Sequence, residues 1–302
     1  GYESAGVFDV TGDGKPNIVS GAYWYETPDI KTQHPIGDVQ QVGEYYDDFS
    51  TIPMDVNGNG RLDFITGGWW GDTIRWRENP GDPSKAWPEH VIAHTGNVET
   101  TRAWDVDGDG QLEIVPNTPG APLVVYKLVT DTAGKGTGEF KAHTIYDQNQ
   151  GHGLGFGDVN GNGRGDFILN SGWLEAPEDP FTGEWVLHPE FNLGGMASVP
   201  MLVVDVNGDG HNDLIVGNGH GYGLDWWEQQ VAADGTRTWI QHPIDPFNAQ
   251  YHDLQWIDLS RGNEHATQRL VSSPHTRLLV CDGELDNLQG VVQSRDVLAG
   301  LF

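Results

Sequence analysis

Short apolar runs alternate with polar, glycine-rich segments along the chain, and no run shows the 3.6-residue period of a helix. The same order of segments recurs five times. A β-like run such as SAGVF or SVPMLVV leads into an acidic loop, and a second apolar run follows, as in NIVSG, DFITG, EIVPN, DFILN and DLIVG. Later runs include TIRWRE and GLDWWEQ, and a last run carries a histidine, as in QHPI or EHVI. This pattern predicts an all-β chain built of four-stranded units.

The size of the unit indicates its architecture. The aspartates that open the acidic loops lie 46 to 53 residues apart, at Asp9, Asp55, Asp105, Asp158 and Asp205. Four strands in about 50 residues make one blade of a β-propeller. We therefore expect a β-propeller of four-stranded blades in residues 1–258, with five Ca²⁺-loop repeats.

A sixth blade is only partly recognisable. The stretch YHDLQWIDLS offers an opening strand, but the loop after Asp258 lacks oxygen ligands at two of the expected positions. Residues 259–302 are therefore expected to form a degenerate last blade or an altered tail of the same domain. Either this blade closes a smaller ring, or the chain is a shortened form of a larger propeller.

Each acidic loop carries the ligands of a hard cation. Oxygen-bearing side chains stand at loop positions 1, 3, 5 and 9, and position 6 is always glycine, which allows the sharp turn that wraps an ion. The predicted ligands are Asp9, Thr11, Asp13 and Asn17; Asp55, Asn57, Asn59 and Asp63; Asp105, Asp107, Asp109 and Glu113; Asp158, Asn160, Asn162 and Asp166; and Asp205, Asn207, Asp209 and Asp213. Up to five structural Ca²⁺ ions are expected. The alternative is a set of Asx-turn loops without metal.

These loops are not EF-hands, because position 12 holds no glutamate and strands flank the loop. The repeated pattern, from residue 3 to about residue 258, resembles the FG-GAP repeat family, whose loops in integrin α-chains bind Ca²⁺. The resemblance implies a β-propeller, most often seven-bladed.

Residues that break the repeat are candidates for function. His34, His90, His143, His188 and His242 occupy the same slot in the last strand of each unit, so they are expected to be structural. His152, His220 and His252 do not repeat. They lie where the first strand begins or just past the second strand, at the rim opposite the acidic loops, and in a propeller they would meet at the mouth of the central channel.

The same rim supplies the other site candidates. We expect His152, His252, His220, Glu99, Asp48 and Arg102 to be catalytic, and Tyr46, Trp24, Trp70, Trp173 and Asp253 to bind substrate. Imidazoles and carboxylates are acid–base groups and metal ligands, and aromatic rings suit the apolar faces of sugars. An additional Zn²⁺ or Mg²⁺ ion at the mouth is part of this hypothesis. For the aromatic residues, core packing is the alternative.

A second resemblance points to an activity. The stretches EYYDDFSTIPMDVNGNGRLDF, GNVETTRAWDVDGDG and GHGLGFGDVNGNGRGDF are similar to the propeller domain of the aldos-2-ulose dehydratases (1,5-anhydrofructose dehydratases). This implies elimination of water from a keto-sugar. In that scheme His152 or His252 takes the α-proton, Arg102 or a metal held by His220 polarises the carbonyl, and Glu99 or Asp48 protonates the leaving hydroxyl.

Charge and composition limit the alternatives. A formal net charge of −28 disfavours nucleic acid and anionic membranes as partners, and no apolar stretch is long enough to insert into a membrane. A small keto-sugar or a glycan is the expected partner. A non-catalytic propeller that binds glycans or proteins is the main alternative to an enzyme, and a lyase acting on uronates is a third. Calcium loops favour a secreted or periplasmic location.

Overall fold

A computed structural model of the chain describes residues 2–254, 256–258, 277–281 and 288–293. This part of the chain consists of strands, turns and loops, and it contains no helix with the length and apolar character needed to cross a bilayer. The chain divides into two compact units, Gly1–Gln150 and Gly151–Phe302, and each is described by itself. The domain boundary expected at residue 258 stays a prediction.

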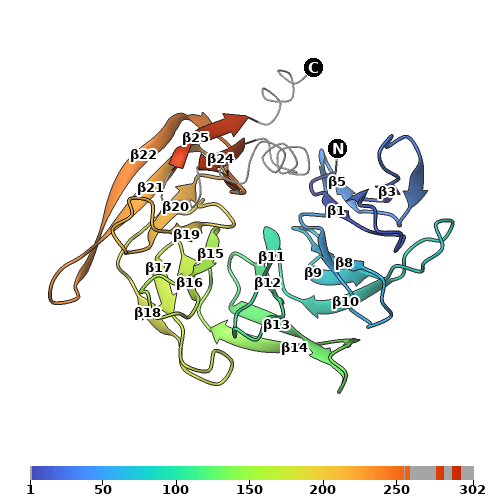
Figure 1. Cartoon of the computed structure of the whole chain (residues 1–302), viewed down its shortest axis with the longest axis horizontal. Helices are drawn as coiled ribbons and strands as arrows, with labels where there is room; N and C mark the ends of the chain where they lie inside the picture. The colour runs from blue at the N-terminus through green and yellow to red at the C-terminus, as the bar shows by residue number, and fades with distance from the viewer. Residues whose placement is uncertain (1, 255, 259–276, 282–287, 294–302) are drawn as a thin grey trace. The chain divides into compact units, whose positions relative to one another are not determined.

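Five four-stranded antiparallel sheets follow one another along the chain, three in the first unit and two in the second. In every sheet the strands neighbour each other in chain order, which is the meander of a propeller blade. Figure 1 labels most of these strands. The predicted all-β fold of four-stranded propeller blades is confirmed.

The strands of the five blades follow the predicted repeats. Blade 1 contains β1 (Gly6–Phe8), β2 (Asn17–Ser20), β3 (Tyr23–Tyr25) and β4 (Gln33–Pro35). Blade 2 contains β7 (Ile52–Met54), β8 (Asp63–Gly67), β9 (Thr73–Arg77) and β10 (Glu89–His94). Blade 3 contains β11 (Thr100–Trp104), β12 (Glu113–Asn117), β13 (Leu123–Thr130) and β14 (Gly136–Tyr146). Blade 4 contains β15 (Leu154–Gly157), β16 (Asp166–Leu169), β17 (Gly172–Glu175) and β18 (Val186–His188). Blade 5 contains β19 (Leu202–Val204), β20 (Asp213–Gly217), β21 (Tyr222–Val231) and β22 (Arg237–Ala249). A small hairpin of β5 (Gln41–Val42) and β6 (Tyr45–Tyr46) joins blades 1 and 2.

The predicted sixth opening strand is β23 (Trp256–Asp258), and it belongs to a sheet of a different kind. It pairs in parallel with β24 (Arg277–Cys281), which pairs antiparallel with β25 (Leu288–Gln293). A meander produces antiparallel neighbours, so these three strands depart from the blade pattern. Most of residues 259–302 lies outside the described residues, and their assignment as a degenerate last blade stays a prediction.

The second strand of each blade is its central element. In β8, β12, β16 and β20 every residue is buried, as expected of a short, mostly apolar strand inside a packed sheet. The acidic loop connects the first strand to this strand, so that loop position 9 is always the first residue of the second strand. Position 6 adopts φ values of 83–89° in all five loops, a left-handed conformation that favours glycine, as predicted.

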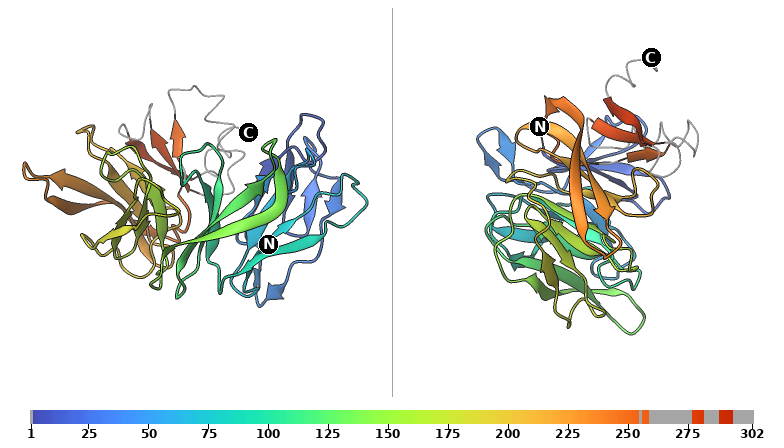
Figure 2. Two further views of the ribbon diagram at one scale, coloured as in Figure 1. Left: turned by 90° about the horizontal axis from the view of Figure 1, so that it is seen from below. Right: turned by 90° about the vertical axis from the view of Figure 1, so that its left-hand side faces the viewer.

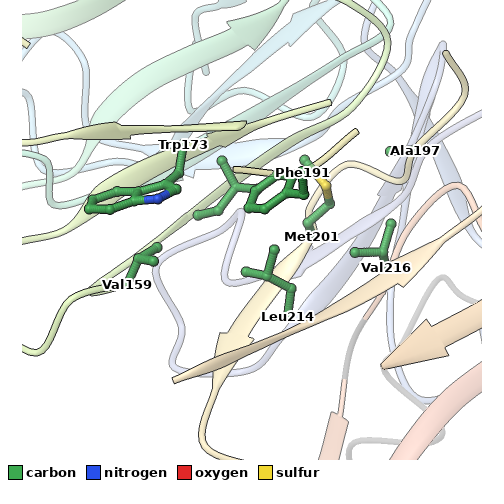
Figure 3. Close-up of a cluster of buried hydrophobic side chains, with 8 residues drawn as sticks. Val159, Trp173, Phe191, Ala197, Met201, Leu214 and Val216 are labelled. Carbon is green, nitrogen blue, oxygen red and sulfur yellow. The ribbon is translucent and has the colours of Figure 1, made fainter. Parts of the chain in front are cut away.

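Blades 4 and 5 share an apolar core within the second unit. Trp173 on β17, Met201, and Leu214 on β20 are almost completely buried and pack in one cluster with Phe191 (Figure 3). The hairpin of β21 and β22, drawn in orange in Figures 1 and 2, is much longer than the other strands of blade 5 and extends beyond them. The segments at the base of this hairpin carry two of the candidate histidines.

Candidate functional site

Three histidines that do not repeat come together within the unit Gly151–Phe302. His152 precedes β15, His220 lies between β20 and β21, and His252 follows β22. Their ring centroids lie 4.5 Å (His220–His252), 4.9 Å (His152–His220) and 5.9 Å (His152–His252) apart. One ring nitrogen from each of them lies within 4.8 Å of the other two. Segments distant in the sequence thus converge on one cluster, which we call the histidine cluster.

One short segment, residues 196–199, holds all three histidine-bearing segments. It lies between blades 4 and 5 in the sequence and makes a hydrogen bond to each of them. The contacts are Nδ1–H of His152 to Ala197 O (2.8 Å), Gly219 N–H to Met196 O (2.8 Å), and Val199 N–H to His252 O (2.8 Å). Because one segment sets the position of three others, the cluster is built into the fold rather than formed by mobile side chains.

The bond from His152 to Ala197 determines the tautomer of the imidazole. A carbonyl oxygen can only accept, so the proton resides on Nδ1 and Nε2 carries the lone pair. His152 is 8% exposed, so packing also restricts the ring. Metal-binding imidazoles are usually held in this way, with one nitrogen donating to a carbonyl and the other facing the ion. The same arrangement suits a proton acceptor.

The backbone around the cluster is adapted to a close approach. A Cβ atom added at Gly219 would lie 3.0 Å from Nδ1 of His252 and 3.2 Å from Cε1 of His152, so a side chain there would displace the rings. His252 Nε2 lies 3.2 Å from Oε1 of Gln250. Gln250 itself has a φ of 66°, a left-handed conformation that costs about 1 kcal/mol or more for a residue other than glycine. Local strain therefore accompanies the placement of His252.

The ligand atoms of the histidine cluster distinguish between Zn²⁺ and Mg²⁺, the two ions expected at the channel mouth. Zinc binds imidazole nitrogens at about 2.0–2.1 Å in a tetrahedral arrangement, which places the nitrogens about 3.3 Å apart. The three nitrogens of the cluster lie within 4.8 Å of one another, which is close to that spacing. Magnesium prefers oxygen ligands. The imidazoles fit a zinc-type ion and do not fit magnesium.

A second group of candidate residues lies in the unit Gly1–Gln150, after β6. Asp47 is 1% exposed and accepts hydrogen bonds from the backbone N–H of Trp70 (2.8 Å) and from Arg75 (3.4 Å). Asp48 is 4% exposed; its Oδ1 accepts from Glu3 N–H (3.1 Å), and its Oδ2 is buried without a hydrogen-bond partner among the described residues. Burial raises the pKa of Asp48 to about 7, although the bond from Glu3 opposes this. A carboxyl group of this kind is suited to general acid catalysis.

Asp48 should make the stability of the fold depend on pH. Its folded pKa of about 7 lies above the ordinary value of 3.8, so the stabilisation is fully present below about pH 4 and is lost as the pH rises to about 7. We expect Asp48→Asn to raise the free energy of unfolding at pH 8 by on the order of 1–3 kcal/mol and to change it little at pH 4. Urea unfolding at both pH values measures this, with Asp147→Asn, at an exposed aspartate, as control. An equal effect of Asp48→Asn at both pH values would contradict the assignment.

The remaining charged candidates have defined places in their own units. Glu99 precedes β11 and its N–H bonds to Asn117 O (2.9 Å), and Arg102 lies on β11 opposite Val115. Both side chains are half-buried and belong to the first unit. Their action together with the histidine cluster, like that of Asp48, stays a prediction.

The substrate-binding roles of Tyr46 and Asp253 also stay predictions. Tyr46 lies on β6, donates its N–H to Oε1 of Glu3 (3.1 Å) and packs edge-on against Tyr2 at 4.6 Å between ring centroids. Asp253 follows His252 directly and is half-buried.

The substrate-binding role predicted for two tryptophans is wrong. Trp24 is 2% exposed and Trp173 is 0% exposed. Each stacks on a histidine of its own blade, His34 at 4.1 Å and His188 at 4.2 Å between ring centroids. Their strands run through the interior of the blade, so the rings have no open face for a sugar. Trp70 is half-buried between β8 and β9, and its role stays a prediction.

The histidines that repeat are structural parts of the blades, as expected. In blades 1, 2, 4 and 5 the histidine stacks on a tryptophan of the third strand, at 4.1–4.5 Å between ring centroids, and its Nε2 bonds to a glutamate at 2.7–2.9 Å. The four sets are Trp24, His34 and Glu26; Trp76, His90 and Glu78; Trp173, His188 and Glu175; and Trp226, His242 and Glu228. In blade 3, His143 stands opposite Val125.

Two exposed aromatic residues near the histidine cluster escaped the sequence analysis. Tyr222 is 72% exposed and begins β21, two residues after His220. Phe247 is 84% exposed on β22, and Tyr222 is paired with Ala249, two residues further along that strand. The register of the hairpin shifts between Tyr222 and Leu224, so the two rings lie on its irregular end, close in sequence to His220 and His252. The sequence could have indicated them, because neither aromatic residue recurs at the equivalent position of the other blades.

The acidic loops share one hydrogen-bond pattern. The position 1 carboxylate accepts the N–H of the position 6 glycine in every loop, at 2.7–3.0 Å. The position 5 oxygen accepts the N–H of position 7 at 2.8–2.9 Å. The position 9 oxygen accepts the N–H of position 2 at 2.8–3.0 Å. Asx-turn geometry, the alternative to a metal loop, is therefore present in all five.

The same oxygens also fit a calcium ion. Carboxylate oxygens of Asp105, Asp107 and Asp109 lie within 4.8 Å of one another. Oδ1 of Asp105 is buried and makes no hydrogen bond within the described part of the chain. Calcium takes six to eight oxygen ligands at about 2.3–2.6 Å and tolerates irregular geometry, so the donor set shared by the loops, with the carbonyl of position 7, suits it. In loop 3, however, Nζ of Lys127 lies among these carboxylates.

Comparison with known proteins identifies the repeats. The family described as FG-GAP-like repeat matches residues 55–115, and the FG-GAP repeat family matches residues 201–237. Among curated proteins, the UPF0053 inner membrane protein YoaE of Escherichia coli strain K12 is 28% identical over 74 residues, and the counterpart from E. coli O157:H7 matches equally. That match covers 24% of this chain and 14% of the relative.

Solved structures give distant likenesses. An Agrocybe aegerita lectin that recognises non-reducing terminal N-acetylglucosamine has a TM-score of 0.45 and 19% identity, over 81% of this chain and 66% of that one. Rhamnogalacturonan lyase YesW has a TM-score of 0.42 and 14% identity, over 78% and 50%. The Vibrio cholerae biofilm matrix protein Bap1 has a TM-score of 0.40 and 14% identity, over 78% and 38%. The first match runs from the acidic loop of blade 2 to that of blade 3, and the second covers the loop of blade 5. These two segments thus match FG-GAP-type repeats, and the same loop geometry recurs in all five blades.

Proposed function

We propose that this protein is a carbohydrate-active lyase that eliminates water from a keto-sugar, with the histidine cluster as its centre. The observation that carries the proposal is the convergence of His152, His220 and His252 on one segment of backbone. Three imidazoles fixed by the fold at a surface turn exceed what blade packing requires, since the repeated histidines already serve that purpose.

Elimination of water β to a carbonyl needs polarisation of that carbonyl, an acceptor for the α-proton and a donor for the leaving hydroxyl. When bound at the cluster, a zinc-type ion supplies the polarising charge. His152 would be the buried ligand, with its Nδ1–H held by Ala197. His220 would be a second ligand from the more exposed side, and His252 would accept the α-proton.

A metal-bound imidazole has no free nitrogen to take the α-proton, so one of the two predicted bases must stay outside the ligand set. His152, held by Ala197, suits the ligand role, and His252 keeps the role of base. Asp48 and Glu99, the candidates for protonating the leaving group, belong to the first unit and keep that role as a prediction.

Sugar binding is proposed to use the exposed aromatic rings of the β21–β22 hairpin. Tyr222 and Phe247 offer apolar faces that suit the C–H surface of a pyranose ring, and both lie a few residues from a histidine of the cluster. They replace Trp24 and Trp173 in this role.

The same surface favours a second candidate function, glycan binding without turnover. Tyr222 and Phe247 are 72% and 84% exposed, so their ring faces are open to stack on a sugar. This alternative needs the hairpin but not the metal.

One experiment separates the two functions. Purified protein is incubated with 1,5-anhydrofructose, and the conjugated product is followed by its ultraviolet absorbance. We expect turnover that is lost with a chelator selective for transition metals and restored by Zn²⁺. Glycan binding that persists with no turnover in the presence of Zn²⁺ would favour the second function. Absence of both binding and turnover would overturn the proposal.

We also propose that the acidic loops of blades 1, 2, 4 and 5 hold structural Ca²⁺. The support is their shared donor set and the left-handed glycine at position 6. Calcium sites of this type suit compartments with millimolar Ca²⁺, and a secreted or periplasmic location follows from this part of the proposal.

A further inference from the structure

One residue of the third strand differs in charge between blade 3 and the other four blades. The residue at loop position 10, on the second strand, pairs with a residue of the third strand, and the position in question is the next residue along that third strand. In blade 2 this partner of Phe64 is Arg77, and Glu78 follows it; in blade 3 the partner of Ile114 is Tyr126, and Lys127 follows it. The corresponding residues in blades 1, 4 and 5 are Glu26, Glu175 and Glu228. Four blades therefore carry an acid where blade 3 carries a base.

The glutamates at this position reach the acidic loop. Oε1 of Glu78 accepts a hydrogen bond from Nδ2 of Asn57 at 3.1 Å, and Oε1 of Glu175 accepts one from Nδ2 of Asn160 at 3.0 Å. Both asparagines are loop position 3, one of the predicted ligands. The third-strand position thus adjoins the place where the ion of the loop would lie.

Lys127 places its ammonium group among the ligands of loop 3. Its Nζ lies 2.5 Å from Asp107, 2.6 Å from Asp109 and 3.2 Å from Glu113. These are positions 3, 5 and 9, and Glu113 is fully buried. Burial alone would lower the pKa of Lys127, but the three carboxylates outweigh it and raise the pKa, which keeps the group charged.

The charges of the loops are matched to this position. Loop 3 carries carboxylates at all four ligand positions, whereas loops 2 and 4 carry asparagine at positions 3 and 5. Four carboxylates and the ammonium of Lys127 leave three net negative charges in blade 3. Two loop carboxylates and the third-strand glutamate also make three in blades 2 and 4. The two additional carboxylates of loop 3 therefore accompany the exchange of the third-strand glutamate for a lysine, which changes the charge by two in the opposite direction.

We propose that Lys127 is the built-in cation of loop 3, so that this loop closes without Ca²⁺ while the other loops take the ion. This inference rests on the proposed calcium binding. A divalent ion entering loop 3 would have to displace the ammonium from three carboxylates and would be repelled by it at close range. In the other blades the third-strand glutamate adds negative charge next to the ion and favours its binding.

The number of bound ions tests the proposal. The full chain is stripped with EGTA, and Ca²⁺ binding is measured by calorimetry, with Tb³⁺ luminescence as a second probe. We expect Lys127→Met to bind one more ion per chain than the wild type. The matched control is Lys141→Met, because Lys141 is the exposed cross-strand partner of Lys127 and its removal changes the charge equally.

A reciprocal variant keeps the test independent of how well Lys127→Met folds. Glu78→Lys gives blade 2 the residue of blade 3, and we expect it to bind one ion fewer than the wild type. Thermal unfolding provides a further readout: Lys127→Met should melt below the wild type in EGTA and recover when Ca²⁺ is added.

The outcomes are distinct. An unchanged ion count in both Lys127→Met and Glu78→Lys, or an equal gain in Lys141→Met, would overturn the inference. A wild type that binds no ion, with none gained in Lys127→Met, would overturn the calcium proposal as well. A wild type that binds ions, with no gain in the variant, would overturn this inference alone.

Discussion

Alanine in place of His152 is expected to lower keto-sugar turnover by roughly 10²–10⁴-fold and to release the zinc-type ion. His152 is the buried member of the cluster, and its tautomer is set by Ala197. Without this imidazole the two remaining histidines lack the ligand that the backbone holds in place. Metal content after gel filtration and turnover with saturating sugar measure the two effects.

The control for this variant is His94→Ala. His94 is an exposed imidazole on β10 that contacts Asp72 at 3.8 Å, far along the chain from the cluster, so turnover should be unchanged. Far-ultraviolet circular dichroism and Ca²⁺ binding should also be unchanged in both variants. Wild-type turnover in His152→Ala, with the ion retained, would remove the histidine cluster from the mechanism.

Alanine in place of Asp166 is expected to lower the free energy of unfolding by about 3 kcal/mol. Asp166 is loop position 9 of blade 4, and it is fully buried at the start of β16. Its Oδ2 accepts from Val159 N–H and its Oδ1 from Ala176 N–H, both at 2.9 Å. Alanine leaves two buried N–H groups without acceptors, and each such group costs about 1–3 kcal/mol. Urea unfolding in EGTA measures this effect free of any bound ion.

Asp166→Asn is the matched variant, because blade 1 has Asn17 at the same position. Oδ1 of Asn17 accepts from Val10 N–H at 3.0 Å, so an amide supports the bond from position 2. Burial raises the pKa of Asp166 to about 6, which indicates that the neutral form is tolerated there. An amide keeps one of the two acceptors and its Nδ2 cannot accept the other N–H, so Asp166→Asn should cost less than Asp166→Ala but more than nothing. Equal losses in the two variants would show that the charge, rather than the hydrogen bonds, holds the loop.

Local features of the blades could be predicted from the sequence. The period-2 runs, the acidic loops and the glycines at position 6 act over a few residues, so the sequence contains the whole cause. The fourth-strand histidines were separated from the candidate site because they recur in the same slot. The tryptophans show the limit of this argument. Trp24 and Trp173 recur only in part, and only their burial in the blade assigns them to the core.

The sequence by itself determined the blades, their acidic loops and the set of histidines that do not repeat, because strand pairing and turn chemistry depend on neighbouring residues. The tertiary structure decided which of those histidines share a site. His152 and Ala197 are 45 residues apart, and no local pattern indicates that residues 196–199 collect three segments. The burial that raises the pKa of Asp48, and the ammonium of Lys127 among the carboxylates of loop 3, were decided in the same way. Long-range packing sets the distances on which charge and coordination depend.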